Sequence, residues 1–124
     1  SYLKNAKLEG ADLKESNLRN AILEGADLRN AILEGADLID VDLKGAKLEG
    51  AELKDAKLVN ADLRGADLKG ADLTGANLSH ANMQDTNLFR INLKGADLFR
   101  TNLKGVDLTG VDISNAFLDK WADN

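Results

Sequence analysis

The stretch Arg64-Gly-Ala-Asp-Leu-Lys-Gly-Ala-Asp-Leu-Thr-Gly-Ala-Asn-Leu78 states a rule that the whole chain of 124 residues obeys. A Leu recurs every five residues, with Ala two positions before it and usually Asp or Asn directly before it. From Leu3 to Leu118 there are 24 such centres without an insertion, and only Met83 and Ile113 are not Leu. A repeat this regular decides the architecture of the chain.

A period of five excludes the two common regular structures. In an α-helix five residues advance by about 500°, so successive Leu residues would step about 140° around the axis and cover every face. In a flat strand an odd period sends successive Leu residues to opposite faces. Ala and Leu lie two apart, however, and in an extended segment they point the same way. A turn after each Leu would keep all of them on one inner side.

The residues two positions after Leu support such turns. All 11 Gly of the chain lie there, together with five Asn and three Asp. These residues tolerate a positive φ. Each pentapeptide is therefore predicted to be a short extended side followed by a corner, with Ala and Leu inward and the residues flanking Leu outward. Such a chain coils as a β-solenoid.

The outward charges indicate how many sides each coil has. Stacked coils are about 4.8 Å apart, so outward residues one coil apart are neighbours and opposite charges are favoured. With four sides we count 11 opposite and 4 like pairs, and with three sides 7 opposite and 12 like pairs. Two columns dominate the four-sided count: Lys7–Asp27–Lys47–Asp67 and Glu9–Arg29–Glu49–Lys69. We expect an all-β, four-sided parallel β-helix of about six coils.

The Ala-Asp-Leu triplets at 26–28, 36–38, 61–63, 66–68, 71–73 and 96–98 resemble the pentapeptide-repeat family. The resemblance implies a right-handed quadrilateral β-helix over residues 1–118, with 119–124 as a C-terminal cap or tail. The family includes DNA-mimicking proteins that bind DNA gyrase, and many members, abundant in cyanobacteria, that have no assigned activity. This chain resembles the second group, because its centres are Leu where the gyrase binders often have Phe, and because it has no projecting loops.

Composition narrows the function further. The net charge is −5, from 21 acidic and 16 basic residues, which argues against direct nucleic-acid binding. There is no Cys, so neither a disulfide framework nor a thiolate metal site is expected. No apolar run approaches the roughly 18 residues of a membrane span. Because there is no secretory signal, the cytoplasm is favoured. The chain begins in register without Met, so a processed exported or lumenal form and a truncation at the N-terminus both stay open.

The sequence offers no case for catalysis. The only His is His80, at a corner, and no motif fixes a nucleophile or a carboxylate beside it. The Gly spacing is not that of a phosphate-binding loop. The acidic columns Asp42/Asp62 and Glu52/Asp72 have Lys or Arg close by and are interpreted as solvated. No cofactor, no metal and no enzymatic activity are predicted.

One side differs from the other three. It is centred on Leu18, Leu38, Leu58, Leu78, Leu98 and Leu118, and Ile39, Val59 and Phe99 are outward on it. None of its corners is Gly, and they include His80 and Arg100, so a different turn type is expected along this edge. These five residues are the candidate protein-contact face. The alternative is that isolated apolar residues are normal on a surface.

The last ten residues break the repeat. Phe117 occupies an outward position and Trp121 follows the last centre. Because a solenoid end needs cover, the preferred interpretation is a cap over the last coil. The alternative is an end-to-end homodimer contact. The chain is thus predicted to be a non-catalytic structural or protein-interaction module with an unknown protein partner. The alternative is a DNA mimic that binds a DNA-processing enzyme such as gyrase.

Overall fold

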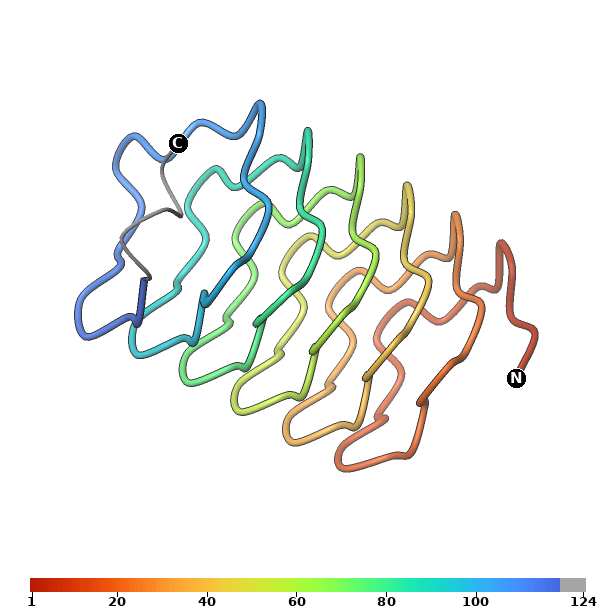
Figure 1. The fold of residues 1–124 in the computed structure, drawn as a ribbon. Coiled ribbons are helices and arrows are strands. Elements are labelled where there is room, and N and C mark those ends of the chain that lie inside the picture. The colour runs from red at the N-terminus through yellow and green to blue at the C-terminus, as the bar shows by residue number, and fades with distance from the viewer. Residues whose placement is uncertain (119–124) are drawn as a thin grey trace.

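A computed structural model describes residues 1–118, and in them the chain winds into a tower of stacked coils (Figure 1). With the exception of the pair Asn87 and Asp107, the residue before each Leu forms a parallel β-bridge to the residue 20 positions away, from Tyr2↔Ile22 to Asp97↔Phe117. Twenty residues are four pentapeptides, so the predicted four-sided coil is confirmed. Single-residue bridges are the only β-structure of the described residues, and there is no helix among them.

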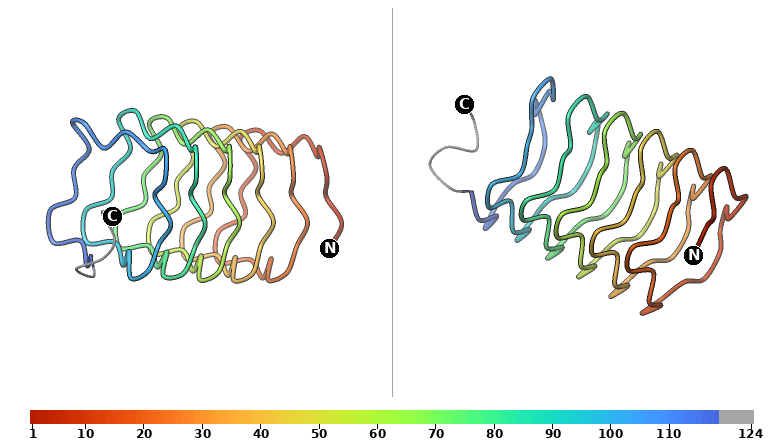
Figure 2. Two further views of the ribbon diagram at one scale, coloured as in Figure 1. Left: turned by 45° about the horizontal axis from the view of Figure 1, so that its top comes forward. Right: turned by 45° about the vertical axis from the view of Figure 1, so that its right-hand side comes forward.

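Four sides therefore run along the tower, and Figure 2 shows the coils lying one above another. The first side is centred on Leu3, Leu23, Leu43, Leu63, Met83 and Leu103; the second on Leu8, Leu28, Leu48, Leu68, Leu88 and Leu108; the third on Leu13, Leu33, Leu53, Leu73, Leu93 and Ile113; the fourth on Leu18, Leu38, Leu58, Leu78, Leu98 and Leu118. The second and fourth sides are opposite each other. Segments far apart in sequence are thus neighbours only within one side or across a corner.

The backbone hydrogen bonds of one pentapeptide explain its pattern. In residues 26–30, Leu28 N–H donates to Lys47 C=O (2.7 Å) and Asn30 N–H to Glu49 C=O (3.0 Å), both in the following coil. Asp27 N–H donates to Ala6 C=O (2.9 Å) in the preceding coil. Across the corner, the N–H of Ala31, the first residue of the next repeat, donates to Leu28 C=O (3.0 Å). Four of the five N–H groups are thereby used, three between coils and one across the corner. The remaining one belongs to the residue after Leu. A backbone donor of this kind needs a partner when water is scarce.

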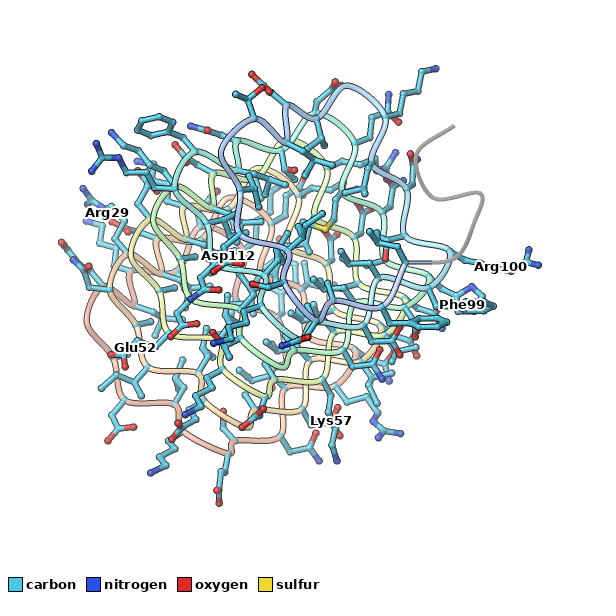
Figure 3. All side chains as sticks on the ribbon, turned by 90° about the vertical axis from the view of Figure 1, so that its left-hand side faces the viewer. Arg29, Glu52, Lys57, Phe99, Arg100 and Asp112 are labelled. Atoms are coloured by element: carbon cyan, nitrogen blue, oxygen red, sulfur yellow. The ribbon has the colours of Figure 1, made fainter. Side chains whose placement is uncertain are left out.

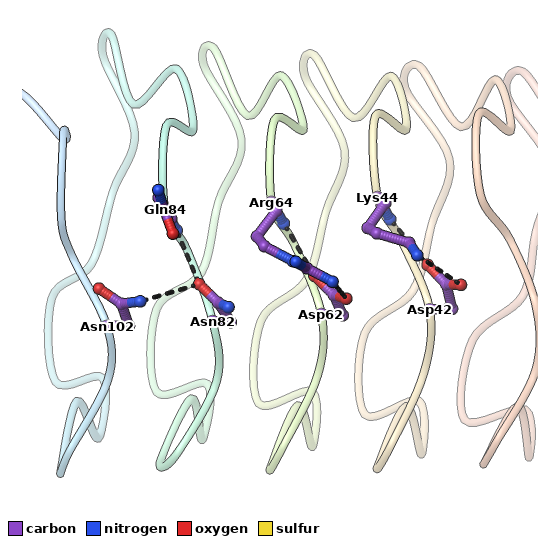
Figure 4. A network of polar contacts seen from close by, with 7 residues as sticks. All are labelled: Asp42, Lys44, Asp62, Arg64, Asn82, Gln84 and Asn102. Carbon is purple, nitrogen blue, oxygen red and sulfur yellow. Dashed lines mark hydrogen bonds and ion pairs between the residues drawn. The ribbon is translucent and has the colours of Figure 1, made fainter.

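Asp or Asn before Leu supplies that partner. In residues 1–118 this position holds 16 Asp or Asn, and in every one Oδ1 accepts the N–H of the residue after Leu at 2.9 to 3.2 Å. Figure 4 shows four such residues on the first side, where Asn102 Nδ2 also donates to Asn82 Oδ1 (3.2 Å). This hydrogen bond recurs in every such repeat, which explains why the position before Leu favours Asp and Asn, two residue types that share the same acceptor atom.

We expect Asn92→Ala to lower the free energy of unfolding by about 1 kcal/mol, because it removes the acceptor of the Lys94 N–H (2.9 Å). Asn92→Asp keeps an oxygen at the same place and should cost much less. Urea unfolding of the two variants measures the difference. Equal losses for both variants would show that the hydrogen bond contributes nothing.

All 23 described corners share one conformation. Each has a positive φ, between 56° and 76°, and each is closed by a bond from the N–H of the next inward residue to the Leu carbonyl. This is the geometry of a type II turn. The expectation of a different turn along the fourth side is therefore wrong: φ is 60° at His80 and 56° at Arg100. The turn bond and the ladder impose the conformation, although a non-Gly residue pays about 1–2 kcal/mol for it.

The core is a stack of Leu and Ala columns that is closed from Ala21 to Leu98. Towards the C-terminus the inward residues become larger, and the packing changes there. Thr86 and Thr101 are buried and donate their hydroxyls to the carbonyls of Met83 (2.9 Å) and Leu78 (2.8 Å). On the second side no bridge joins Asn87 to Asp107 in the following coil. A cavity of about 260 Å³ opens there, and it is lined by Thr86, Asn87, Leu88, Phe89, Gly105, Asp107 and Thr109.

Candidate protein-binding face

The fourth side carries a column of outward residues that are mostly uncharged. Ile39 and Val59 follow Leu in adjacent coils, Ser79 follows next and Phe99 after it. All four are half-buried. On the other sides the same column is dominated by Lys, Arg and Glu. The fourth side therefore offers the longest apolar outer surface of the described residues.

An aromatic cluster forms at the C-terminal part of this side. The rings of His80 and Phe99 meet edge to face with centroids 5.6 Å apart, and Phe99 and Phe117 lie 5.9 Å apart at an interplanar angle of 32°. The Arg100 guanidinium carbon lies 5.4 Å from the centroid of Phe99 (Figure 3). Phe117 is 55 % exposed. Three aromatic rings and one guanidinium thus form a continuous outer cluster with Phe99 at its centre.

The large corner residues are held in a costly conformation and pack on phenylalanine. His80 and Arg100 have positive φ and contact Phe99, while Arg90 has a φ of 60° and lies 5.2 Å from the centroid of Phe89. Contacts between a cation and an aromatic ring are worth about 0.5–1 kcal/mol at exposed sites. They offset part of the backbone strain. An observed strained residue of this kind is a reason to look for function at its position.

Charged residues border the fourth side at its N-terminal part. Arg19 donates to Asp37 through Nε (3.2 Å) and Nη2 (2.9 Å). This guanidinium and the N–H of Ile39 lower the pKa of Asp37. This ion pair holds the two charged side chains in place at the N-terminal end of the apolar column.

Similar pairs make the tower sensitive to acid. Arg29 donates to both carboxylate oxygens of Asp27 (2.8 and 2.6 Å) and lowers the pKa of Asp27 to about 2. Because the folded pKa lies below the unfolded value, the stabilisation is complete above about pH 4 and is lost as the pH falls towards 2. We expect the melting temperature to be constant between about pH 7 and pH 5 and to fall below pH 4. In Asp27→Asn the acid-induced fall should be smaller. Equal pH profiles for the two proteins, measured by circular dichroism, would contradict this assignment.

The other sequence candidates are distributed over the tower. Ile39 and Val59 are neighbours, whereas Phe99 is separated from Val59 by the coil that contains Ser79. His80, Phe99, Arg100 and Phe117 are brought together, and the contact of Phe117 was not predicted. Trp121 lies outside the described residues, so the cap and the end-to-end contact remain predictions.

The acidic column of Asp42 and Asp62 is paired with bases, whereas Glu52 and Asp72 form no ion pair within 4 Å among residues 1–118. Asp42 Oδ2 is 3.8 Å from Lys44 Nζ, and Asp62 Oδ2 is 2.6 Å from Arg64 Nη2 (Figure 4). No group of three or more His, Cys, Asp and Glu side chains gathers in this range. No helix there is long and apolar enough to cross a bilayer.

A second aromatic site was not among the sequence candidates, although the four-sided register predicts that its Phe89 lies on the side opposite Phe99. Phe89, on the second side, is 54 % exposed, with Lys69 Nζ 5.8 Å from its ring centroid and Arg90 beside it. The signal was the repeated Leu-Phe-Arg at 88–90 and 98–100. The two copies lie on opposite sides and form separate sites, as the four-sided register requires.

The chain matches the family described as "Pentapeptide repeats" in eight copies, over residues 1–35, 36–75, 56–95 and 86–120. No curated protein sequence matches it significantly. Among solved structures it is similar to the pentapeptide repeat protein Rfr23 from the cyanobacterium Cyanothece 51142, with 40 % identity and a TM-score of 0.63. The match covers 76 % of this chain and 60 % of Rfr23, so the chain spans less than two thirds of that relative.

Two further solved structures are also similar to this chain. QnrB1, a plasmid-mediated fluoroquinolone resistance protein, has 22 % identity and a TM-score of 0.64, covering 98 % of this chain and 69 % of that one. At this identity the likeness shows the fold alone. A pentapeptide repeat protein from the Arabidopsis thaliana thylakoid lumen has 34 % identity and a TM-score of 0.41, with 77 % and 63 % covered. The likeness to Rfr23 and QnrB1 implies a right-handed quadrilateral β-helix, and the family match shows that the chain belongs to the pentapeptide repeat family.

Proposed function

We propose that the protein is a non-catalytic interaction module and that its fourth side binds a partner protein. The observation that carries the proposal is the cluster of His80, Phe99, Arg100 and Phe117. Aromatic residues and Arg are enriched in protein interfaces and supply most of the binding energy there. The column of Ile39 and Val59 extends the same surface along the tower.

The fourth side is also rigid, which favours the binding of a partner. The fourth side is part of a continuous backbone ladder, so its side chains are held without an ordering loop or lid. A preformed surface loses little conformational entropy on binding. The partner should therefore meet a flat, apolar strip with charged ends.

Partner capture with side-specific variants tests the proposal. The variant Ile39→Ser/Val59→Ser/Phe99→Ser uses the residue that Ser79 already places in this column. The control Glu24→Ser/Gln84→Ser/Lys104→Ser alters three residues of the column after Leu on the first side, in other coils, without changing net charge. Proteins captured from the source lysate by the wild type and the control, but lost with the fourth-side variant, are the expected result. Identical profiles for all three would remove this face from consideration.

DNA mimicry is the second candidate, and the third side favours it. In residues 1–118 the third side holds seven acidic residues against three Lys, whereas each other side has equal numbers of acids and bases. Mimicry requires an acidic face of this kind, but Lys14, Lys54 and Lys94 interrupt the acidic residues. A gyrase supercoiling assay separates the two functions: protection from a quinolone would place DNA mimicry first.

A further inference from the structure

The second side has a charge pattern that no other side shares. In the first four coils its outward residues before Leu are Lys7, Asp27, Lys47 and Asp67, and those after Leu are Glu9, Arg29, Glu49 and Lys69. The sign alternates along each column and also between the two columns within every coil. On the other three sides uncharged residues such as Ile22, Ile32 and Ile39 interrupt any such pattern.

Only three of the eight charges in this pattern form ion pairs among residues 1–118. Arg29 pairs with Asp27 (2.6 Å) and with Glu9 (3.6 Å). The other five charges of the pattern form no ion pair within 4 Å among residues 1–118: Lys7, Lys47, Glu49, Asp67 and Lys69. Glu49 Oε1 is shielded from solvent and has no hydrogen-bond partner there. If the Glu49 side chain rotates outward, this oxygen gains a hydrogen bond from a cationic donor of another molecule.

We propose that the second side binds a second copy of this chain. The two towers lie side by side in the same direction, related by a two-fold axis parallel to both, so that each coil faces the same coil of the other copy. The axis runs between the two outward columns. Each column then faces the other column of the second copy, so Lys47 faces the second copy's Glu49 and the reverse contact is made as well. In all four coils only opposite charges meet, which is the self-complementarity that an isologous dimer requires.

The shape of this side suits the arrangement. Two depressions follow its edges, one of about 570 Å³ that includes Lys7, Gly25 and Lys47, and one of about 400 Å³ that includes Glu49 and Gly70. The second depression also contains Gly50, so two adjacent corners lack side chains. The Gly70 corner is open and leaves room for a long charged side chain of the second copy, whereas the Asn30 side chain lies over Gly50 and the Asn5 side chain over Gly25.

The parallel arrangement is preferred over an antiparallel one because it uses the whole side. Antiparallel towers would also match opposite charges in the first four coils, but the remaining coils would extend past each other. In parallel towers Asn87 faces the second copy's Phe89, and Asp107 faces the second copy's Thr109, so no like charges meet. More surface is then buried, which a specific interface needs.

The dimer would leave the proposed binding face free. Figure 3 shows Arg29 of the second side and Phe99 of the fourth side on opposite flanks of the tower. Two copies joined through their second sides therefore present their fourth sides outward, in opposite directions. Because exposed ion pairs are individually weak and are screened by salt, the association should be weak and salt-sensitive.

Sedimentation equilibrium tests the proposal. The wild type should associate at about 20 mM NaCl, with a dissociation constant at least about tenfold lower than at about 500 mM NaCl. Lys47→Glu and Glu49→Lys should each weaken association about tenfold, because symmetry places like charges together twice. Mixing these two variants should restore wild-type affinity, because the two reversed charges then face each other. Lys57→Glu on the fourth side makes the same change in net charge as Lys47→Glu and should have no effect.

Several results would overturn the proposal. A wild type that is monomeric at both salt concentrations would do so, whether or not the variants fold. Equal weakening by Lys57→Glu would assign the effect to net charge. Failure of the mixture to recover affinity, with both variants shown to be folded by circular dichroism, would exclude the parallel pairing.

Discussion

Replacing Leu63 by Asp is expected to unfold the tower. Leu63 is 1 % exposed and lies on the first side with coils above and below it. The substitution loses about 1.5–3 kcal/mol of apolar burial and places an unpaired carboxylate in the core at a further cost of several kcal/mol. Native domains have only about 5–15 kcal/mol of stability in total. Since each coil depends on its neighbours, a failure in the middle interrupts the stack.

Ile22→Asp is the matched control for this prediction. Ile22 lies one position before Leu23, points outward and is 38 % exposed. In that position Asp would accept the N–H of Glu24, as 16 other residues of the chain do in their own repeats. The control should keep the wild-type melting temperature, whereas Leu63→Asp should show no cooperative melt by circular dichroism. A wild-type melt for Leu63→Asp would refute the assignment of inward and outward positions.

The architecture could be predicted because it follows from the spacing alone. Leu and Ala two apart must share a face, and a turn must follow, whatever the outer residues are. The opposite-charge count identified four sides, because like charges on adjacent coils are unfavourable. The role of Asp and Asn before Leu was missed. It requires an account of all five N–H groups of a repeat, and only the structure shows which one the ladder and the turn leave without a partner.

The corner residues show where sequence preference fails. Arg100 and His80 disfavour a positive φ, so the sequence predicts a different turn, yet the corner has the same conformation as at Gly. The hydrogen bonds to the next coil and across the turn outweigh the local preference. Contacts on the candidate face were also only partly predictable. Phe99 and Phe117 occupy different outward columns of adjacent coils, and only the reach of their side chains brings the rings together.

Phe99→Ala should have the largest effect of any single substitution on partner binding. Phe99 contacts His80, Arg100 and Phe117, and it is the only one of the four that touches all the others. Truncation removes the ring itself and releases the groups that pack on it. Central aromatic residues of this kind cost 2 kcal/mol or more when truncated, which corresponds to at least about a 30-fold loss of affinity.

Phe89 provides a control within the same chain. It is also an exposed Phe after Leu, with an Arg at the following corner and a Lys close to its ring, but it lies on the second side. Phe89→Ala removes the same number of atoms and the same type of cation contact. Any general effect of losing an exposed ring on the stability of the tower should appear in both variants.

Titration of a captured partner against the wild type, Phe99→Ala and Phe89→Ala by calorimetry tests the central claim most directly. Binding through the fourth side predicts at least about a 30-fold higher dissociation constant for Phe99→Ala and an unchanged one for Phe89→Ala. Unchanged affinity for Phe99→Ala, with melts showing all three proteins folded, would contradict the assignment of the fourth side as the binding face.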